Sequence, residues 1–284
     1  MPEPLRLLSA DYSTITAEPP NVVFLDAQPL SRHEELDLPP YREFLEDATG
    51  IPITYINLPR GDQLPTDPQQ LDGIFLGGSL YNLEDAKMYS WIGEEIEFLQ
   101  SAKGVAVLGS CFGHQALAAA HGGGELIKLP QKVLGYRENI KTTEGMNQPL
   151  LNELSDRSAV AVSHSFFVSE TPQGLPGVKV IEAARGRYKG KLLPNEILIY
   201  WDLEKAEPFG ISSQSHYEFK GKAASAFAQD ANRPPTINGL PIHHRGSLEI
   251  FQQRAERDGG KLIDIWVNKL VIPRYKAHSQ AVAV

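Results

Sequence analysis

The stretch Gly104–Gln115 constrains the fold of this chain more than any other, and it holds the only cysteine among 284 residues. A β-branched apolar run before the cysteine predicts a buried strand, and an alanine-rich run after it predicts a helix. Cys111 stands between them, with Gly109 and Gly113 two residues away on either side. A strand, a tight turn with a nucleophile and a helix make a nucleophile elbow, in which small flanking residues allow close packing.

This placement predicts how the thiol of Cys111 would be activated. A cysteine is a good nucleophile only as a thiolate, and the positive end of the following helix favours that form. The unpaired N–H groups of the first helical turn, notably that of Phe112, can also stabilise an oxyanion. The alternative is a small buried core cysteine, which is the usual fate of a lone cysteine.

Composition limits the classes of protein to consider. The chain is 42% hydrophobic and 22% charged, as in a globular protein, and its net charge of −8 argues against nucleic-acid binding. A single cysteine excludes internal disulfides and suits a reducing cytosol, so we expect a cytoplasmic protein. The sequence has no secretory signal, no long apolar span and no metal-ligand spacing. We therefore expect no membrane contact, no metal and no cofactor.

A second glycine feature lies upstream of the elbow. The run Leu71–Leu76 reads as a buried strand and ends in Gly77 and Gly78. Such a pair lets the backbone approach a ligand and point N–H groups at it, although a plain tight turn is the alternative. Strands and helices alternate up to this point, which favours a mostly parallel sheet covered by helices. Sites in such sheets lie at the carboxyl ends of strands, where Gly78 and Cys111 both fall.

A candidate base and its orienting group come about a hundred residues after the elbow. Residues 209–214 suit a strand, and His216 and Glu218 follow it. Two residues that are two positions apart in an extended segment project to the same face. This arrangement suits a general base and the carboxylate that orients it, although a surface histidine near a glutamate is the commoner case.

The remainder of the chain predicts a helical extension. Residues 248–257 and 262–271 have the pattern of two amphipathic helices, and residues 277–284 have none. We expect a single domain over residues 1–284. It would comprise a core of about 5–219, a helical extension at 220–276 and a tail at 277–284 that we expect to be disordered.

Four motifs together resemble the class I glutamine amidotransferase family. They occur in the order and approximate spacing of that family, cover roughly residues 50–219, and are Gly77-Gly78, Gly109–Gln115, Ser163–Ser165 and Gln214–Glu218. The chain is most similar to stand-alone members, of the GMP synthase amidotransferase or γ-glutamyl hydrolase kind. The resemblance implies an α/β, flavodoxin-like fold with a mostly parallel central sheet.

The same resemblance implies a Cys-His-Glu triad. Cys111 would attack the side-chain amide carbon of a γ-glutamyl group and form a γ-glutamyl thioester. His216 would act as base and then acid, and Glu218 would hold its imidazole in the right tautomer. The N–H groups of Gly78 and Phe112 would form the oxyanion hole, and water would release glutamate.

The family pattern also implies residues that hold the substrate. We expect Gln115 and the segment Ser163, His164 and Ser165 to bind the amino-acid end of the substrate, beside the backbone of Gly77. His164 is a second candidate base, but its fit to the substrate-holding strand argues against that role.

Two residues depart from the family pattern. Ser110 precedes the elbow cysteine where the family has an apolar residue, and Tyr217 replaces the proline of the usual His-Pro-Glu. The hydroxyl of Ser110 could change the packing at the strand end or contact substrate. Both catalytic side chains around Tyr217 are kept, so neither change predicts an inactive protein.

The implied reaction leaves the amine product open. The chain contains no segment that resembles a synthetase domain, and it has no phosphate-binding glycine-rich loop. We therefore favour hydrolysis of glutamine or of a γ-glutamyl amide of a larger amine. The alternatives are a glutaminase subunit that delivers ammonia to a separate synthetase, and a non-catalytic binding protein with this fold.

Overall fold

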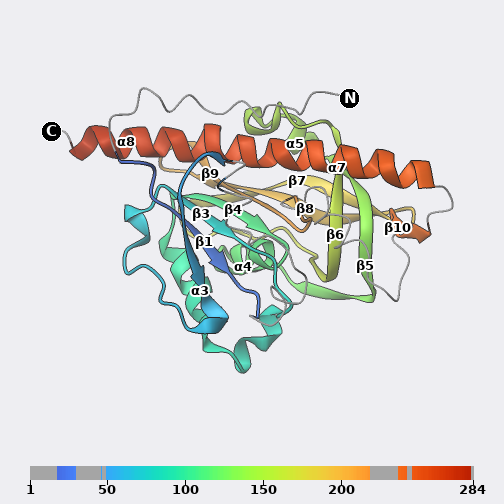
Figure 1. Cartoon of the computed structure of the whole chain (residues 1–284), viewed down its shortest axis with the longest axis horizontal. Coiled ribbons are helices and arrows are strands. Elements are labelled where there is room, and N and C mark those ends of the chain that lie inside the picture. The colour runs from blue at the N-terminus through green and yellow to red at the C-terminus, as the bar shows by residue number, and fades with distance from the viewer. Residues whose placement is uncertain (1–17, 30–45, 47–48, 218–235, 242–244, 283–284) are drawn as a thin grey trace.

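The structure is a computed structural model that describes residues 18–29, 46, 49–217, 236–241 and 245–282, and its centre is one large sheet flanked by helices (Figure 1). The expected α/β class is therefore confirmed. None of the helices within these ranges is long and apolar enough to cross a membrane.

One half of the sheet is parallel. Its strands, in spatial order, are β2 (Ile53–Asn57), β1 (Val22–Asp26), β3 (Gly73–Leu76), β4 (Ala106–Ser110) and β9 (Glu207–Ser213). Each of these strands pairs in parallel with its neighbour, and their side chains are almost all buried on both faces. The predicted parallel sheet is this half, and the helix α3 (Ser90–Ser101) lies in the connection from β3 to β4.

The other half of the sheet is antiparallel. It continues from β9 through β8 (Lys191–Asp202), β7 (Val178–Tyr188) and β5 (Leu126–Lys141), and β6 (Arg157–Val168) pairs with β5. The short strands β10 (Thr236–Ile237) and β11 (Leu240–Pro241) extend the edge beyond β5. The pairs β5–β6, β7–β8 and β8–β9 are consecutive in the chain and antiparallel, so they need no crossover. The short strand β10 pairs in parallel with β5. The whole sheet is therefore mixed.

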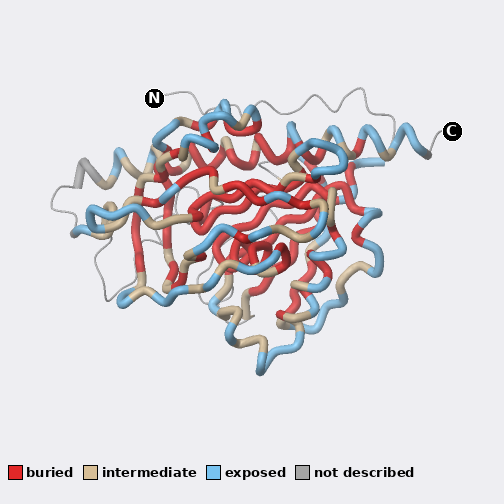
Figure 2. The backbone as a smooth tube through the Cα atoms, turned by 180° about the vertical axis from the view of Figure 1, so that it is seen from behind, coloured by how far each residue is buried: buried red, intermediate tan, exposed pale blue. Residues whose placement is uncertain are grey.

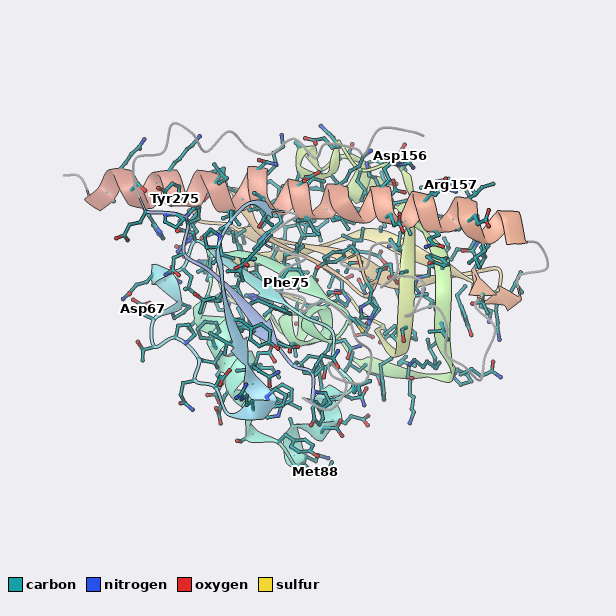
Figure 3. The ribbon with its side chains drawn as sticks, viewed as in Figure 1. Asp67, Phe75, Met88, Asp156, Arg157 and Tyr275 are labelled. Carbon is teal, nitrogen blue, oxygen red and sulfur yellow. The ribbon has the colours of Figure 1, made fainter. Side chains whose placement is uncertain are left out.

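Helices cover both faces of the parallel half. On one face lie α3 (Ser90–Ser101) and α4 (Phe112–Ala120), and on the other lies a long C-terminal helix that starts with α7 (Arg245–Trp266). Side chains of β3 alternate between the two cores: Ile74 packs with the first layer, and Phe75 packs edge-on against Trp266. Figure 3 shows Phe75 in the middle of the molecule, and Figure 2 shows that the backbone in the middle of the molecule is mostly buried.

Short helices complete the described chain. They lie in the connections between strands and are η2 (Leu58–Arg60), η3 (Pro68–Gln70), η4 (Leu83–Lys87), α5 (Thr143–Met146) and η5 (Pro149–Leu151).

The C-terminal region differs from the predicted extension. Instead of two separate helices and a disordered tail, α7 continues through the π-helical turn η6 (Val267–Val271) into α8 (Ile272–Val282). This long helix lies along the sheet (Figure 1). Trp266 is fully buried and donates its indole N–H to the Ala106 carbonyl at 3.1 Å. Burying such a side chain contributes about 2–3 kcal/mol, so this segment belongs to the core.

Local and long-range causes explain why the helix does not stop. Pro273 would clash with the carbonyl four residues before it in a regular helix, and the wider π turn that ends at Val271 comes just before it. Farther on, the Tyr275 hydroxyl donates to the Glu18 carbonyl at 2.7 Å, and His278 Nδ1 lies 2.8 Å from Asp72 Oδ1. These contacts order residues 277–282, where we predicted disorder from the lack of an apolar pattern.

Candidate active site

The predicted elbow is present at the carboxyl end of β4. Strand β4 ends at Ser110, α4 begins at Phe112, and Cys111 between them has φ 50° and ψ −102°. A non-glycine residue in such a conformation is strained by about 1–3 kcal/mol and persists only where its surroundings hold it. The Cys111 N–H donates to the Ser213 carbonyl at 2.9 Å, and its carbonyl accepts the Gln115 N–H at 3.1 Å. These two hydrogen bonds hold the backbone of Cys111 in its strained conformation.

The two flanking glycines are needed because the backbone packs too closely for a side chain. A Cβ on Gly109 would lie 2.9 Å from the Gly113 carbonyl oxygen, and a Cβ on Gly113 would overlap Leu76. The Gly113 N–H instead donates to the Gly77 carbonyl at 3.0 Å. This hydrogen bond ties the elbow to the end of β3.

The glycine pair Gly77-Gly78 lies beside both Cys111 and His216. A Cβ on Gly78 would lie 2.7 Å from His216 Cε1 and 3.5 Å from Cys111 Cβ, so Gly78 occupies the space beside both. Gly77 is used by the fold, because its N–H donates to the Leu25 carbonyl at 3.1 Å and its carbonyl is taken by Gly113. Gly78 is thus the glycine of the pair that faces the site, and a substrate contact by Gly77 stays a prediction.

The predicted base lies just beyond the end of β9. His216 is 5% exposed, and its N–H donates to the Ala161 carbonyl on β6 at 2.8 Å. This contact holds the histidine between the parallel half of the sheet and β6. Glu218 lies outside the described residues, so its place in the triad stays a prediction.

Gln214 contacts the nucleophile, and sequence reasoning gave it no role. Its Nε2 donates to Cys111 Sγ at 3.6 Å, and its Oε1 accepts the Gln115 Nε2 at 3.1 Å. Gln214 is almost fully buried at the end of β9. An amide two residues before a candidate base was the only signal in the sequence. The predicted substrate contact of Gln115 stays a prediction, since its amide donates to Gln214.

The segment Ser163–Ser165 on β6 passes the nucleophile. The Ser163 carbonyl lies 4.0 Å from Cys111 Sγ, which places this backbone next to the thiol. His164 is buried, and its Nδ1 donates to the Phe166 carbonyl at 2.7 Å. Burial lowers the pKa of His164 well below its ordinary value, and the nearby Arg137 guanidinium lowers it further. His164 is therefore a fixed, neutral ring, which does not suit a second base.

The two departures from the family pattern both have contacts inside the fold. The Ser110 hydroxyl donates to the Ser215 carbonyl at 3.2 Å. Tyr217 is buried and packs edge-on against Phe75, with ring centroids 6.3 Å apart. Tyr217 therefore belongs to the hydrophobic core, directly after His216 in the chain.

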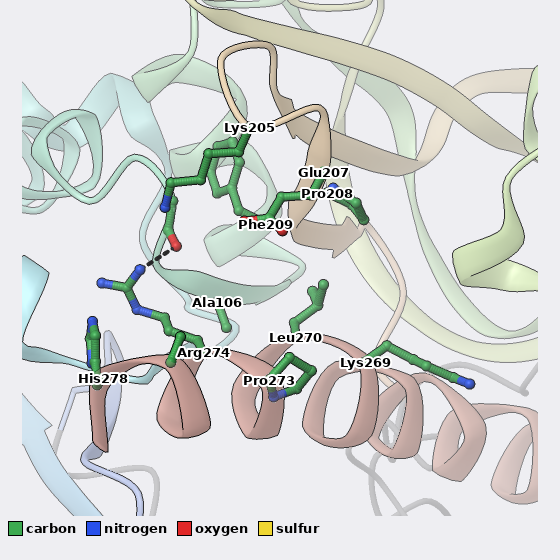
Figure 4. Close-up of a pocket in the computed structure, with 12 residues that line it drawn as sticks. Ala106, Lys205, Glu207, Pro208, Phe209, Lys269, Leu270, Pro273, Arg274 and His278 are labelled. Carbon is green, nitrogen blue, oxygen red and sulfur yellow. Dashed lines mark hydrogen bonds between the residues drawn. The ribbon is translucent and has the colours of Figure 1, made fainter. Parts of the chain in front are cut away.

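A cavity of about 200 Å³ lies at the opposite ends of strands β4 and β9 from the site (Figure 4). It borders the amino ends of β4 and β9, near Ala106 and Glu207, whereas the site follows their carboxyl ends. The Arg274 guanidinium beside it donates to the carbonyls of Leu71, Gly104 and Gln69 at 2.8, 2.6 and 3.0 Å. This arginine attaches the C-terminal helix to the sheet. Within the described ranges, no three His, Cys, Asp or Glu side chains converge to hold a metal ion.

Comparisons with known proteins give the same family and fold as the geometry described above. The family described as "Glutamine amidotransferase class-I" matches residues 48–188, which include Gly78 and Cys111 and end before His216. A glutamine amidotransferase from Thermotoga maritima is 15% identical with a TM-score of 0.61, over 90% of this chain and 99% of that one. A glutamine amidotransferase from Methylobacillus flagellatus is 18% identical with a TM-score of 0.63, over 89% and 96%.

A candidate GMP synthase subunit from Thermoplasma acidophilum is more distant. It is 14% identical with a TM-score of 0.50, over 74% of this chain and 92% of that one. At these identities the three structures show the shared fold, and no curated protein sequence matches the chain.

The fold and the elbow define an α/β protein with a cysteine at the carboxyl edge of a flavodoxin-like sheet. The chain belongs to the class I glutamine amidotransferase family. Cleavage of an amide C–N bond is the chemistry of that family.

Proposed function

We propose that this chain hydrolyses γ-glutamyl amide bonds through a thioester on Cys111, and releases glutamate and an amine. The observation that carries the proposal is the close grouping of the strained Cys111, His216 and Gly78 at the carboxyl ends of adjacent strands. The amine is ammonia when the substrate is glutamine, and a larger amine when it is another γ-glutamyl amide. The single cysteine supports a reducing, cytoplasmic setting.

The proposed mechanism has two halves. His216 takes the proton of the Cys111 thiol, and the sulfur attacks the γ-carbonyl carbon. The N–H groups of Phe112 and Gly78 stabilise the oxyanion. The C–N bond then breaks, the leaving nitrogen takes the proton from His216, and the thioester remains. In the second half, His216 takes a proton from water, the hydroxyl attacks the thioester, and the sulfur leaves and recovers its proton.

The remaining assignments complete this scheme. Glu218 orients the imidazole of His216, as the orienting acid does in comparable triads. Gln115, Gly77 and the segment Ser163–Ser165 hold the glutamyl part of the substrate. The position of Ser163 next to the sulfur supports the last assignment.

A substrate panel tests the proposal. We expect purified protein to release glutamate from glutamine or from at least one γ-glutamyl amide, and Cys111→Ala to lower that rate at least about 10³-fold. Glu218→Gln should lower the rate and leave KM largely unchanged. Hydrolysis by Cys111→Ala at the wild-type rate would refute the nucleophile. Binding of γ-glutamyl ligands without turnover would favour the non-catalytic alternative.

A second candidate is a glutaminase that delivers ammonia to a separate synthetase. The segment after Gly78 exposes three apolar side chains, with Leu80 46%, Met88 71% and Tyr89 39% exposed. Figure 3 shows Met88 at the periphery of the molecule. Exposed apolar side chains in the segment that follows Gly78 suit a contact with a protein partner. Glutaminase activity that appears only with a partner, and that Met88→Glu removes, would favour this candidate. A clear preference for a bulky γ-glutamyl amide would exclude it.

A further inference from the structure

A buried polar network joins the two segments that carry Cys111 and His216. We call Ala106–Ala120 the nucleophile arm and Glu207–Tyr217 the base arm. The Ser110 hydroxyl, directly before Cys111, donates to the carbonyl of Ser215, directly before His216, at 3.2 Å. Both serines are fully buried. A side chain of one arm therefore holds the backbone of the other.

Ser215 is held at each of its polar atoms. Its N–H donates to Ser213 Oγ at 3.2 Å, its carbonyl accepts from Ser110, and its hydroxyl accepts from Asn139 Nδ2 at 3.3 Å. The same hydroxyl donates to Glu196 Oε1 at 2.7 Å, a short and charge-assisted hydrogen bond. Ser215 has therefore little freedom to shift.

Glu196 on β8 holds two consecutive residues of the base arm. Its carboxylate accepts from the Ser215 hydroxyl, and its backbone carbonyl accepts the Gln214 N–H at 3.1 Å. Gln214 in turn places its amide 3.6 Å from Cys111 Sγ. Glu196 thus fixes the residue that contacts the sulfur and the residue next to the base.

The charge of Glu196 is balanced by a buried arginine. Arg137 on β5 forms an ion pair with Glu196 Oε2, and the two side chains are 0% and 1% exposed. A Cβ on Gly186 would lie 2.7 Å from Arg137 Nε and 2.8 Å from Glu196 Oε2, so a glycine leaves the room for this pair. A buried ion pair adds little stability over apolar side chains of the same volume. A contribution to stability therefore does not explain why the chain has the Arg137–Glu196 ion pair.

We propose that Glu196, with its charge balanced by Arg137, is a positioning residue for the reaction, which acts through Ser215 and Gln214 to hold His216 and the Gln214 amide against Cys111. This inference rests on the proposed function for its kinetic consequences, but its effect on the thiol can be measured without any substrate. Glu196 does not touch the sulfur, so its influence passes through the residues it holds.

Ser215→Ala tests the inference and leaves the ion pair in place. Because the chain has one cysteine, the rate of alkylation by iodoacetamide reports on Cys111 alone. We expect Ser215→Ala to lower that rate at pH 7 about tenfold, and to lower kcat about tenfold with KM within about twofold. Ser158→Ala is the matched control, since Ser158 is a buried serine on β6 that is not among the hydrogen-bond partners of Ser215 or Glu196, although it lies opposite Asn139 in the β5–β6 ladder. It should leave both rates unchanged.

Glu196→Gln is the second variant. It keeps the shape of the side chain and removes its charge, and we expect the alkylation rate to fall at least as far as in Ser215→Ala. If Glu196→Gln does not fold, Ser215→Ala still decides the question. Equal alkylation rates in Ser215→Ala and Ser158→Ala would overturn the inference. Slower alkylation in Ser215→Ala, together with a wild-type protein that hydrolyses no γ-glutamyl amide, would support it and refute the proposed function.

Discussion

The nucleophile arm and the base arm reach the same site but are held in different ways. Around Cys111 the fold relies on backbone packing, where Gly113 lies against Leu76 with no room for a side chain. Around His216 it relies on buried polar side chains from β5 and β8, with Glu196 at their centre, and on a backbone carbonyl of β6. Backbone packing tolerates almost no change in shape, whereas side-chain ends can shift. We therefore expect substitutions in the nucleophile arm to cost more stability than substitutions in the base arm.

Gly113→Ala should have the largest effect on stability. The added Cβ would overlap Leu76 Cβ and lie 2.7 Å from the Leu76 carbonyl oxygen, and neither atom can move without the strand. We expect the free energy of unfolding, measured with urea, to fall by about 3 kcal/mol, and hydrolysis to be lost.

The matched control is Gly93→Ala near the start of α3, where no atom outside the helix's own backbone and chain neighbours lies within 4 Å of the added Cβ. This change should raise stability by about 0.5–1 kcal/mol, because alanine favours a helix. Similar losses in the two variants would refute the packing account of the nucleophile arm.

A buried carboxyl beneath the nucleophile arm should make stability depend on pH. Glu95 lies on α3, which packs against α4, and burial raises its pKa to about 8, with Asp26 adding to the shift. Between pH 4.5 and 8 the folded protein holds a proton on Glu95 that the unfolded chain has lost. This contribution to stability therefore falls as pH rises through that window, and stays low above it.

Glu95→Gln removes the titrating group and keeps its shape. At pH 8 we expect it to raise the free energy of unfolding by about 2 kcal/mol, and by much less at pH 5. Urea unfolding of both proteins at the two pH values measures the difference. A variant that is equally stabilised at both would show that Glu95 does not change its charge in this range.

Gly186→Ala should destabilise the protein less than Gly113→Ala, because it alters the side-chain network of the base arm. The added Cβ would lie 2.7 Å from Arg137 Nε and 2.8 Å from Glu196 Oε2, so these side-chain ends must shift, whereas the backbone need not. We expect stability to fall by about 1 kcal/mol and kcat to fall with KM nearly unchanged. A loss as large as that of Gly113→Ala would remove the contrast between the arms.

The contrast also explains what the sequence could predict. Gly109, Cys111 and Gly113 could be assigned because an elbow requires those residue types at fixed local spacing. Glu196 and Arg137 could not be assigned, because Glu196 contacts Ser215 from β8, Arg137 pairs with Glu196 from β5, and no local sequence pattern relates these residues. The order of residues 277–282 was missed for the same reason, since Tyr275 and His278 contact distant segments.

Some assignments still rest on the family pattern. Glu218 as the orienting acid, the oxyanion N–H groups of Gly78 and Phe112, and the substrate contacts of Gln115 and Ser165 stay predictions. The position of Gly78 between His216 and Cys111 is the observation that most supports them.

Trapping the thioester tests the central claim most directly. The protein is mixed with glutamine or with the preferred γ-glutamyl amide, quenched in acid during turnover, and analysed by peptide mass spectrometry. We predict a γ-glutamyl group on the peptide that contains Cys111, and none in Cys111→Ala, which should also release no glutamate. Full-rate hydrolysis without that adduct, retained in Cys111→Ala, would contradict the account.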